Sequence, residues 1–447
     1  MRMIDIHAFY EHKVREFDSL VLLATYLRSE GLSVSIADLN YSRRSLILKS
    51  KPSIAILPFL YSLNTVQSYG INYESLYGYT PTYINLHWEQ LGSENSSNFL
   101  DPTDDFAKNA FHVSWSKDFS SRLEGAGAKR EHIWLTGNPR ADLLTDKFTE
   151  TYISKRSLLK ELKIPEVKRI ALFIMSFNAA YWSKEKIQNL ANEHEFPKAE
   201  QFSRISKKAL KETIEIVRNL SKPLHEKEMY IILRPHPATP IDSIKEMVKD
   251  CRNIRVSRKF PLNQVIFNSD LVMSWISTGT IDSYVFGKPT LILRPSSVPK
   301  EFDIPFLRGF QFAKTYRDVL DNLDTLAFNA QILDEFAERI YGFLDGYNCL
   351  RIVSKIGDLL KTDSFKMPEV ISKKHFANES LKFVIKDIPR SILKKCLPSL
   401  LPGRLRSISD DSYSKKEEDL YVEKYSILVE NMVQSWKLYS ASEKSEG

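Results

Sequence analysis

The first 145 residues alternate between short apolar runs and longer segments whose apolar residues recur at helical spacing. Short apolar runs bounded by polar turns are typical of strands, and apolar residues at every third or fourth position are typical of helices. Helices are expected between the strands, for example over residues 13–30. The predicted strands cover residues 3–9, 33–39, 53–58, 82–86, 111–114 and 133–136. This alternation predicts a parallel sheet with helices on both faces.

A second alternation of the same kind starts at residue 169 and continues to about residue 294. Its longest predicted helix covers residues 207–220, and the charged segment before it, 146–168, is interpreted as a linker. We therefore predict an α/β protein with two Rossmann-like domains. The expected parts are a first domain (1–150), a second domain (165–330), helices that pack back on the first domain (331–365) and a helical tail (371–447).

Polar residues follow one apolar strand of the second domain directly. The strand over residues 229–233 is almost wholly apolar, as expected of a strand buried on both faces, and runs into Arg234-Pro235-His236-Pro237. The carboxyl ends of strands in an open α/β sheet form the edge where ligands bind, so Arg234 and His236 are predicted to contact a nucleotide phosphate. A structural, hydrogen-bonded histidine is the commoner case, but the two prolines fix the chain direction around this imidazole.

A small-residue turn follows the strand predicted over residues 270–275. The turn consists of Ser277, Thr278, Gly279 and Thr280, and it opens a helix predicted to end at Gly287. The free amides and the positive dipole end of such a helix attract anions, and the hydroxyls add donors. The alternative is that the turn only caps the helix, which is the commonest use of these residues. We predict that this turn and Arg234 hold the same phosphate.

Two further loops lie at carboxyl ends of predicted strands. Ser176 and Asn178 follow the first strand of the second domain, and Asn138 and Arg140 follow the last strand of the first domain. All four are predicted to bind the donor. Arg140 is suited to pair with a phosphate or a sugar carboxylate through two nitrogens, although a turn that ends a strand and starts a helix is the plainer interpretation.

The predicted catalytic base lies in the first domain. The strand over residues 82–86 ends in His87, Trp88 and Glu89. A glutamate beside an indole in a dry cleft has its pKa raised towards neutrality, so Glu89 is expected to accept the proton of an acceptor hydroxyl. Two alternatives stay open: His87 is the base and Glu89 orients it, or Trp88 anchors a loop and Glu89 is solvated.

Composition narrows the class of protein. The chain has 447 residues, of which 43% are hydrophobic and 27% charged, as in ordinary globular proteins with more than one domain. Its three cysteines are widely spaced, which argues against a disulfide framework or a zinc site and indicates a reducing compartment. No apolar segment is long enough to span a bilayer, so we expect a cytoplasmic protein.

The positive charge is concentrated in one segment. Residues 373–406 contain nine lysines and arginines and two acidic residues, an excess equal to the net charge of +7 for the whole chain. Apolar residues alternate with the lysines at roughly helical spacing, which predicts peripheral attachment to an anionic membrane or a docking helix. The alternative is a helix packed on the catalytic body with its lysines in water. Nucleic acid is not favoured, because no aromatic platform accompanies the charge.

Several of these motifs together resemble a known family. They are residues 11–16 (Glu-His-Lys-Val-Arg-Glu), 136–140 (Thr-Gly-Asn-Pro-Arg), 234–237 and 277–282, the last followed by Gly-Lys-Pro at 287–289. The combination resembles bacterial surface-polysaccharide biosynthesis proteins of the GT-B type, over roughly residues 1–365. It is most similar to the group with capsule and O-antigen Kdo transferases. Polysialyltransferases and the CDP-glycerol phosphotransferases of teichoic acid synthesis are more distant relatives.

The resemblance implies two Rossmann-like domains that face each other across a cleft, here with a basic helical extension. It also implies a CMP- or CDP-linked donor, whose phosphate is held by His236 and the turn at 277–280. The expected function is a glycosyltransferase that moves a sugar, such as Kdo, from a CMP-activated donor to a capsule, lipopolysaccharide or lipid-linked glycan at the inner membrane. No metal or other cofactor is expected, because a nucleoside monophosphate leaving group carries little charge.

Two alternatives to this function stay open. One is a polyol-phosphate transferase that uses CDP-glycerol, and the other is a non-catalytic GT-B protein that binds nucleotide or glycan in an assembly complex. Relatives carry an acidic motif with a glycine where this chain has residues 87–92. This departure leaves the acceptor and the identity of the base open.

Overall fold

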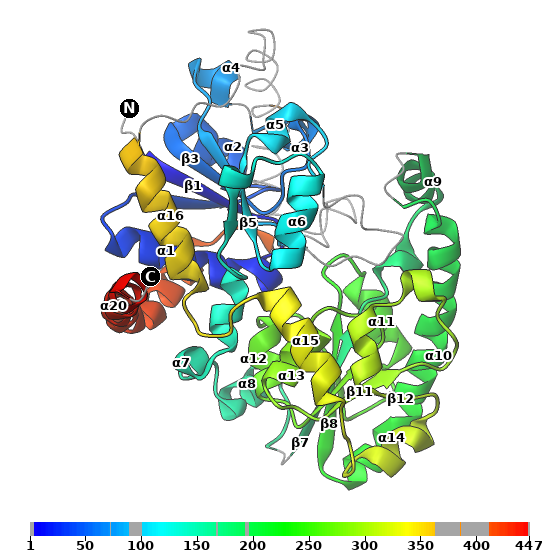
Figure 1. Cartoon of the computed structure of the whole chain (residues 1–447). Coiled ribbons are helices and arrows are strands. Elements are labelled where there is room, and N and C mark those ends of the chain that lie inside the picture. Colours follow the sequence, from blue (N-terminus) through cyan, green and yellow to red (C-terminus); the bar gives the residue numbers. More distant parts are fainter. Residues whose placement is uncertain are drawn as a thin grey trace. The chain divides into compact units, whose positions relative to one another are not determined.

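The computed structural model describes residues 4–71, 73–88, 101–166, 169–192, 196–362, 385 and 411–445. The chain divides into two compact units (Figure 1). Unit 1 takes its described residues from 4–88, 101–151 and 338–445, and unit 2 takes them from 152–337. Each unit is built around one six-stranded parallel sheet. The fold is therefore the predicted pair of Rossmann-like α/β domains.

Unit 1 has the strand order β2-β1-β3-β4-β5-β6. Its strands are β1 (Ile4–Tyr10), β2 (Val34–Asp38), β3 (Pro52–Leu57), β4 (Thr82–Asn85), β5 (Phe111–Ser114) and β6 (Ile133–Leu135). Its helices include α1 (Asp18–Ser29), α2 (Arg43–Lys49), α3 (Leu63–Ser68), α4 (Tyr73–Tyr77), α5 (Asp105–Lys108), α6 (Lys117–Gly125) and α7 (Asp146–Thr149). All six strands were expected within two residues of their ends, because a buried strand between polar turns is a strong sequence signal.

Two helices from the end of the chain complete unit 1. Helices α16 (Asn348–Thr362) and α20 (Lys415–Ser445) both pack on α1 (Figure 1). Aromatic pairs accompany this packing, with ring centroids 5.8 Å apart for Phe17 and Tyr421 and 6.4 Å apart for Phe148 and Tyr425. The first domain therefore includes residues far beyond position 150.

Unit 2 has the strand order β12-β11-β10-β7-β8-β9. Its strands are β7 (Arg169–Met175), β8 (Met229–Pro235), β9 (Ile254–Val256), β10 (Leu271–Ser274), β11 (Thr290–Leu293) and β12 (Gln311–Ala313). Its helices are α8 (Lys155–Glu161), α9 (Lys184–Asn192), α10 (Ala199–Glu226), α11 (Ile241–Met247), α12 (Leu262–Phe267), α13 (Thr280–Val285) and α14 (Tyr316–Asn322), and α15 (Ala330–Tyr341) runs from unit 2 into unit 1. Every residue of β8 is buried, which agrees with its apolar sequence.

Four sequence expectations need correction. Helix α10 is twice as long as the predicted helix at 207–220, and the segment taken as a linker contains α7 and α8. The edge strands β9 and β12 were missed, since three residues carry too little periodicity. The helix expected over 13–30 begins as a π-helical turn, Lys13–Phe17, before α1. The basic segment 373–406 lies outside the described residues except for Ile385.

Candidate functional site

The predicted phosphate-binding residues of unit 2 lie on three adjacent strands. In the sheet, β7 lies between β10 and β8, and the chain reverses its direction of progress between β7 and β10. Ligands of open α/β sheets bind at the carboxyl edge beside such a reversal. The residues predicted from the sequence follow β7 (Ser176, Asn178), β8 (Arg234, His236) and β10 (residues 277–280). The structure therefore brings these loops to one edge of the sheet.

The loop after β8 fixes the orientation of His236. The Nδ1 atom of His236 lies 3.1 Å from the backbone nitrogen of Ala238 and accepts its proton. The backbone carbonyl of His236 accepts a second bond, from the amide of Thr239 at 2.8 Å. Because Nδ1 is an acceptor, a neutral ring carries its proton on Nε2. His236 is therefore held as a tautomer that donates from Nε2.

Arg258 fastens the same loop and was missed by the sequence reasoning. Its guanidinium donates to the carbonyls of His236 and Thr239, each at 3.3 Å, and to the carbonyl of Pro237. All three bonds come from one guanidinium nitrogen, Nη1, so Arg258 holds three carbonyls of the loop around a single point. The one sequence signal for Arg258 is its position shortly after the three-residue strand β9, and that strand was not predicted either.

The turn at 277–280 is less helical than expected. Helix α13 has six residues rather than running on to Gly287, so its dipole is small. The residue at its N-cap is Gly279, which offers no side-chain cap, and a Cβ there would lie 2.5 Å from Cδ2 of Leu262. Ser277 and Thr278 are half-buried, whereas the buried hydroxyl of Thr280 has no hydrogen-bond partner within the described part of the chain.

The loops after β7 and β10 are tied together. The hydroxyl of Ser176 donates to the carbonyl of Ile276, and Phe177 stacks on Trp275 with ring centroids 4.6 Å apart. Asn178 is half-buried at the start of a 3₁₀ turn, Asn178–Tyr181. Ser176 thus positions the backbone that leads into the turn at 277–280.

Two buried arginines add positive charge at this edge. Arg234 is 6% exposed, and Arg294, directly after β11, is 7% exposed. Arg294 pairs with Asp303 at 2.6 Å and donates to the carbonyl of Trp275. Burial lowers the pKa of Arg294, although the nearby Asp303 carboxylate opposes this shift. Arg294, also missed from the sequence, therefore supports the start of the turn at 277–280.

The predicted base region of unit 1 looks different. Glu89 lies outside the described residues. His87 has no exposed surface, and its Nε2 atom lies 2.8 Å from Nδ1 of His112. Burial, with a smaller effect from His112, lowers the pKa of His87 well below its usual value. His87 therefore has the surroundings of a neutral, structural histidine.

The turn with Asn138 and Arg140 supports helix α16 of unit 1. The side chain of Asn138 is buried and accepts from the amide of Arg140 at 2.9 Å. Its backbone carbonyl accepts from the side chain of Asn348 at 3.0 Å. Gly137 has a φ of +81°, and a Cβ there would lie 2.1 Å from Oδ1 of Asn348. Packing against Asn348 therefore explains why Gly and Asn stand at positions 137 and 138. The prediction that Asn138 binds the donor did not foresee this packing.

Asp142 reaches the same helix. Its two carboxylate oxygens accept from the amides of Asn348 and Cys349, each at 2.8 Å, so Asp142 caps the first turn of α16. Burial raises the pKa of Asp142 to about 7, although these two hydrogen bonds oppose the shift.

Residues 11–16 form a charged cluster at the carboxyl end of β1. The carboxylate of Glu16 is fully buried, accepts from the amide of Glu11 at 2.7 Å and pairs with Arg15 at 2.7 Å. His12 lies 3.3 Å from Asp411, just before α20. Burial alone would lower the pKa of His12, but the bond to Asp411 and the nearby carboxylates raise it. The sheet of unit 1 reverses between β1 and β3, so this cluster lies at a second binding edge.

In the ranges that the structure describes, no three His, Cys, Asp or Glu side chains are grouped so that they could hold a metal ion. Nor does any helix of these ranges have both the length and the apolar character needed to cross a bilayer.

Comparisons with known proteins give a relative in sequence and several relatives in fold. No family model matches the chain. It is similar to the teichoic acid ribitol-phosphate polymerase TarK of Staphylococcus aureus (strain NCTC 8325 / PS 47), with 23% identity over 270 residues, which are 58% of this chain and 47% of TarK. The chain thus matches about half the length of this relative.

Solved structures agree on the fold. The wall teichoic acid polymerase TagF aligns with a TM-score of 0.50 and 12% identity, over 81% of this chain and 90% of TagF. A variant of TagF gives a TM-score of 0.51 with 13% identity, over 80% and 89% of the two chains. These likenesses show a GT-B fold of two Rossmann-like domains. None of these relatives is a Kdo transferase.

Proposed function

We propose that this protein transfers an alditol phosphate, such as ribitol or glycerol phosphate, from a CDP-linked donor to a hydroxyl of a wall-polymer acceptor. The similarity to TarK and the shared fold with TagF support this alternative better than transfer of Kdo from a CMP-sugar. One TagF structure with a TM-score of 0.50 comes from a soak with CDPG. We also propose, as expected from the sequence, that the protein is cytoplasmic and that its donor is a nucleotide.

The observation that carries the proposal locally is the loop after β8. His236 is held in the tautomer that donates from Nε2, and Arg234 lies two residues before it, near the end of β8. A charge-assisted donor and a fixed imidazole suit the phosphate of a departing nucleotide, because they stabilise charge that grows as the bond breaks. In our proposal they bind the cytidylate phosphate, together with the turn at 277–280.

The reaction takes place at phosphorus. The acceptor oxygen attacks the phosphorus that carries the alditol, and a new phosphodiester bond forms. The bond from that phosphorus to the bridging oxygen breaks, CMP leaves with the electron pair, and the hydroxyl proton passes to a base. Glu89 remains the predicted base, whereas the alternative, His87, is fully buried against His112. We propose that the reaction needs no metal ion, so a chelator should leave the rate unchanged, and full loss restored by magnesium would contradict this.

The test is a donor panel with the full-length protein. CDP-ribitol, CDP-glycerol and CMP-Kdo are each offered with a lipid-linked acceptor, and CMP release and product mass are measured. We expect CMP release with a CDP-alditol only, and a product whose mass has grown by one or more alditol-phosphate units. A product that gains Kdo but no phosphorus, formed from CMP-Kdo, would replace the proposal by glycosyl transfer. Nucleotide binding without turnover on any donor would favour a non-catalytic assembly protein.

A matched pair of histidine variants links the activity to the site. His236→Ala should lower kcat at least about a hundredfold, because a donor to developing charge is lost. His225→Ala is the control, since His225 is exposed in the last turn of α10, before β8. Equal rates in the two variants would remove His236 from the mechanism.

Membrane attachment through residues 373–406 stays a separate proposal, because these residues lie outside the described ranges apart from Ile385. It is tested by replacing their lysines with glutamine and measuring sedimentation with anionic vesicles. Removing the whole tail would be a poor test, because α20 packs on α1. Unchanged sedimentation of the glutamine variant would refute the attachment.

A further inference from the structure

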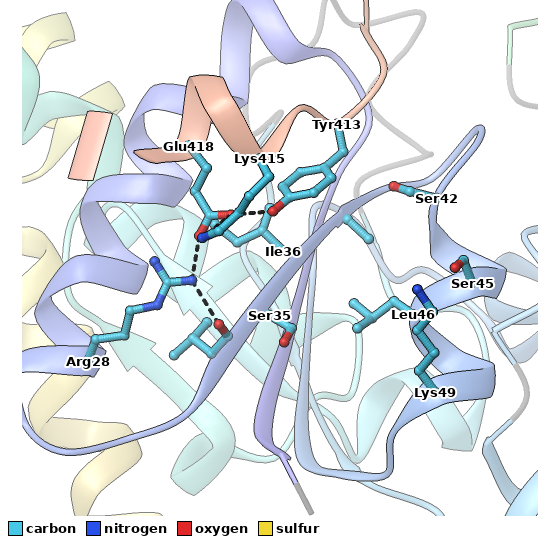
Figure 2. Close-up of a pocket in the computed structure, with 12 residues that line it drawn as sticks. Arg28, Ser35, Ile36, Ser42, Ser45, Leu46, Lys49, Tyr413, Lys415 and Glu418 are labelled. Carbon is cyan, nitrogen blue, oxygen red and sulfur yellow. Dashed lines mark hydrogen bonds and ion pairs between the residues drawn. The ribbon is translucent and has the colours of Figure 1, made fainter. Parts of the chain in front are cut away.

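A pocket of about 320 Å³ opens in unit 1 between β2, α2 and the start of α20 (Figure 2). The pocket is of the size that holds a small ligand. Strand β2 forms the edge of its sheet, and residues just before and within α20 form one wall. None of the residues predicted from the sequence to bind donor or acceptor lines this pocket.

The charges around the pocket favour an anion. The lining has three basic side chains, those of Arg28, Lys49 and Lys415, and one carboxylate, that of Glu418. Lys415 also pairs at 2.9 Å with Asp419, which is not part of the lining, so the remaining excess is one positive charge. Glu418 is 1% exposed and already paired, since it lies 2.5 Å from Arg28 and also accepts from the hydroxyl of Tyr413. The charge of Lys49 is therefore not balanced by Glu418.

Three polar groups on the lining make no internal bond. Across the part of the chain that the structure describes, no hydrogen bond or ion pair involves the side chains of Ser35, Ser45 or Lys49. Figure 2 shows Ser45 and Lys49 on the α2 side of the pocket, opposite Arg28 and Glu418. An ammonium and hydroxyls near one another can donate to a phosphate and its neighbouring hydroxyl groups.

Part of the lining is apolar. Ile36 and Leu46 line the pocket between these polar groups. A ligand that fits both the polar and the apolar parts of this lining is a small unit with a negative charge, hydroxyl groups and C–H surface. An alditol phosphate has these three features.

We propose that this pocket binds one alditol-phosphate unit of the growing polymer, with Lys49 contacting its phosphate and Ser35 and Ser45 its oxygens. The inference rests on the proposed function, and it gives unit 1 a subsite for polymer already made. A polymer held there stays on the enzyme between transfers. The enzyme therefore adds several units before it releases the product.

The experiment measures binding without any donor. Full-length protein is titrated calorimetrically with a synthetic glycerol-phosphate trimer, with glycerol 3-phosphate and with CMP. The variant is Lys49→Ala, chosen because Lys49 is exposed and its loss should not disturb folding. The control is Lys355→Ala, an exposed lysine on α16 of the same unit.

We expect Lys49→Ala to weaken trimer binding about tenfold, the usual effect of one lost charge-assisted bond, and Lys49→Glu to weaken it further. CMP binding and trimer binding by the control should not change. With a CDP-alditol donor, Lys49→Ala should give shorter products at an unchanged rate of first transfer.

Three results would overturn the inference. They are equal trimer affinity in Lys49→Ala and the parent protein, loss of CMP binding in Lys49→Ala, and binding of glycerol 3-phosphate as tight as that of the trimer. The last result would indicate a site for a free phosphate ester. The titration contains no donor, so its result does not depend on whether the protein transfers alditol phosphate. Failure of the transfer reaction would be seen in the donor panel instead.

Discussion

The cap that Asp142 provides to α16 allows a quantitative prediction. Its carboxylate is buried and accepts from two backbone amides. Replacing Asp142 with Ala leaves both amides buried without a partner, and each costs about 1–3 kcal/mol. Asp142→Ala should therefore lower the free energy of unfolding by roughly 2–6 kcal/mol. Asp142→Asn keeps one acceptor and should cost less.

The same residue makes stability depend on pH. Burial raises the pKa of Asp142 from 3.8 to about 7 in the folded protein. A carboxyl with a raised folded-state pKa stabilises the fold when protonated, so this contribution is complete below about pH 3.8 and is lost as the pH rises through about 7. Between pH 5 and pH 8 the loss should be on the order of 2–3 kcal/mol, at about 1.4 kcal/mol per pH unit. Asp142→Asn should remove it.

The assay is urea unfolding at pH 5 and pH 8 of the parent protein, the two variants and the control Asp146→Asn. Asp146 is exposed at the start of α7, so its replacement should change stability by less than about 0.5 kcal/mol. The reasoning would be refuted by an Ala variant as stable as the control. It would also be refuted if the difference in unfolding free energy between the parent protein and Asp142→Asn were the same at pH 5 and pH 8.

Three further predictions test the two units. Gly279→Ala should destabilise the protein by about 1–3 kcal/mol because of the contact with Leu262, and adding Leu262→Ala should recover part of this in thermal unfolding. Arg258→Ala should raise KM for the donor about tenfold, because the bonds that hold the His236 loop are lost, and Arg258→Lys should raise KM by less. An unchanged KM in Arg258→Ala would contradict this role of Arg258. Arg28→Ala leaves the buried Glu418 without its closest cation and should cost roughly 2–4 kcal/mol, seen as faster hydrogen exchange in α20.

The strands could be predicted because their signal is local. The strand prediction for β5 matches the observed bounds, since every residue of this strand is buried. Helix ends and short edge strands depend on neighbours that are distant in sequence, and these were the parts that were missed or misplaced. The π-helical turn at Lys13–Phe17 was missed for a different reason: its buried Glu16 accepts from backbone amides only four and five residues away, an arrangement that the apolar pattern does not reveal.

The candidate site was predicted in part. Arg234, His236 and the turn at 277–280 lie at the same edge of the sheet as expected, but not on neighbouring strands, because β7 lies between β8 and β10. Arg258 and Arg294 were missed, since an arginine that binds backbone carbonyls leaves no sequence motif. Asn138 was assigned to the donor because its partner, Asn348, is 210 residues away and invisible to local reasoning.

The division of the chain also sets the order in which its parts can fold. The described residues of unit 2 form one continuous span, whereas α1 of unit 1 is covered by helices from the far end of the chain. During synthesis the second sheet can form as soon as it leaves the ribosome, while the first must wait with an uncovered apolar helix until α16 and α20 emerge. Contacts of such large sequence separation form slowly and leave surface open to aggregation. Chaperone demand during expression should therefore come mainly from the amino-terminal sheet, although it is made first.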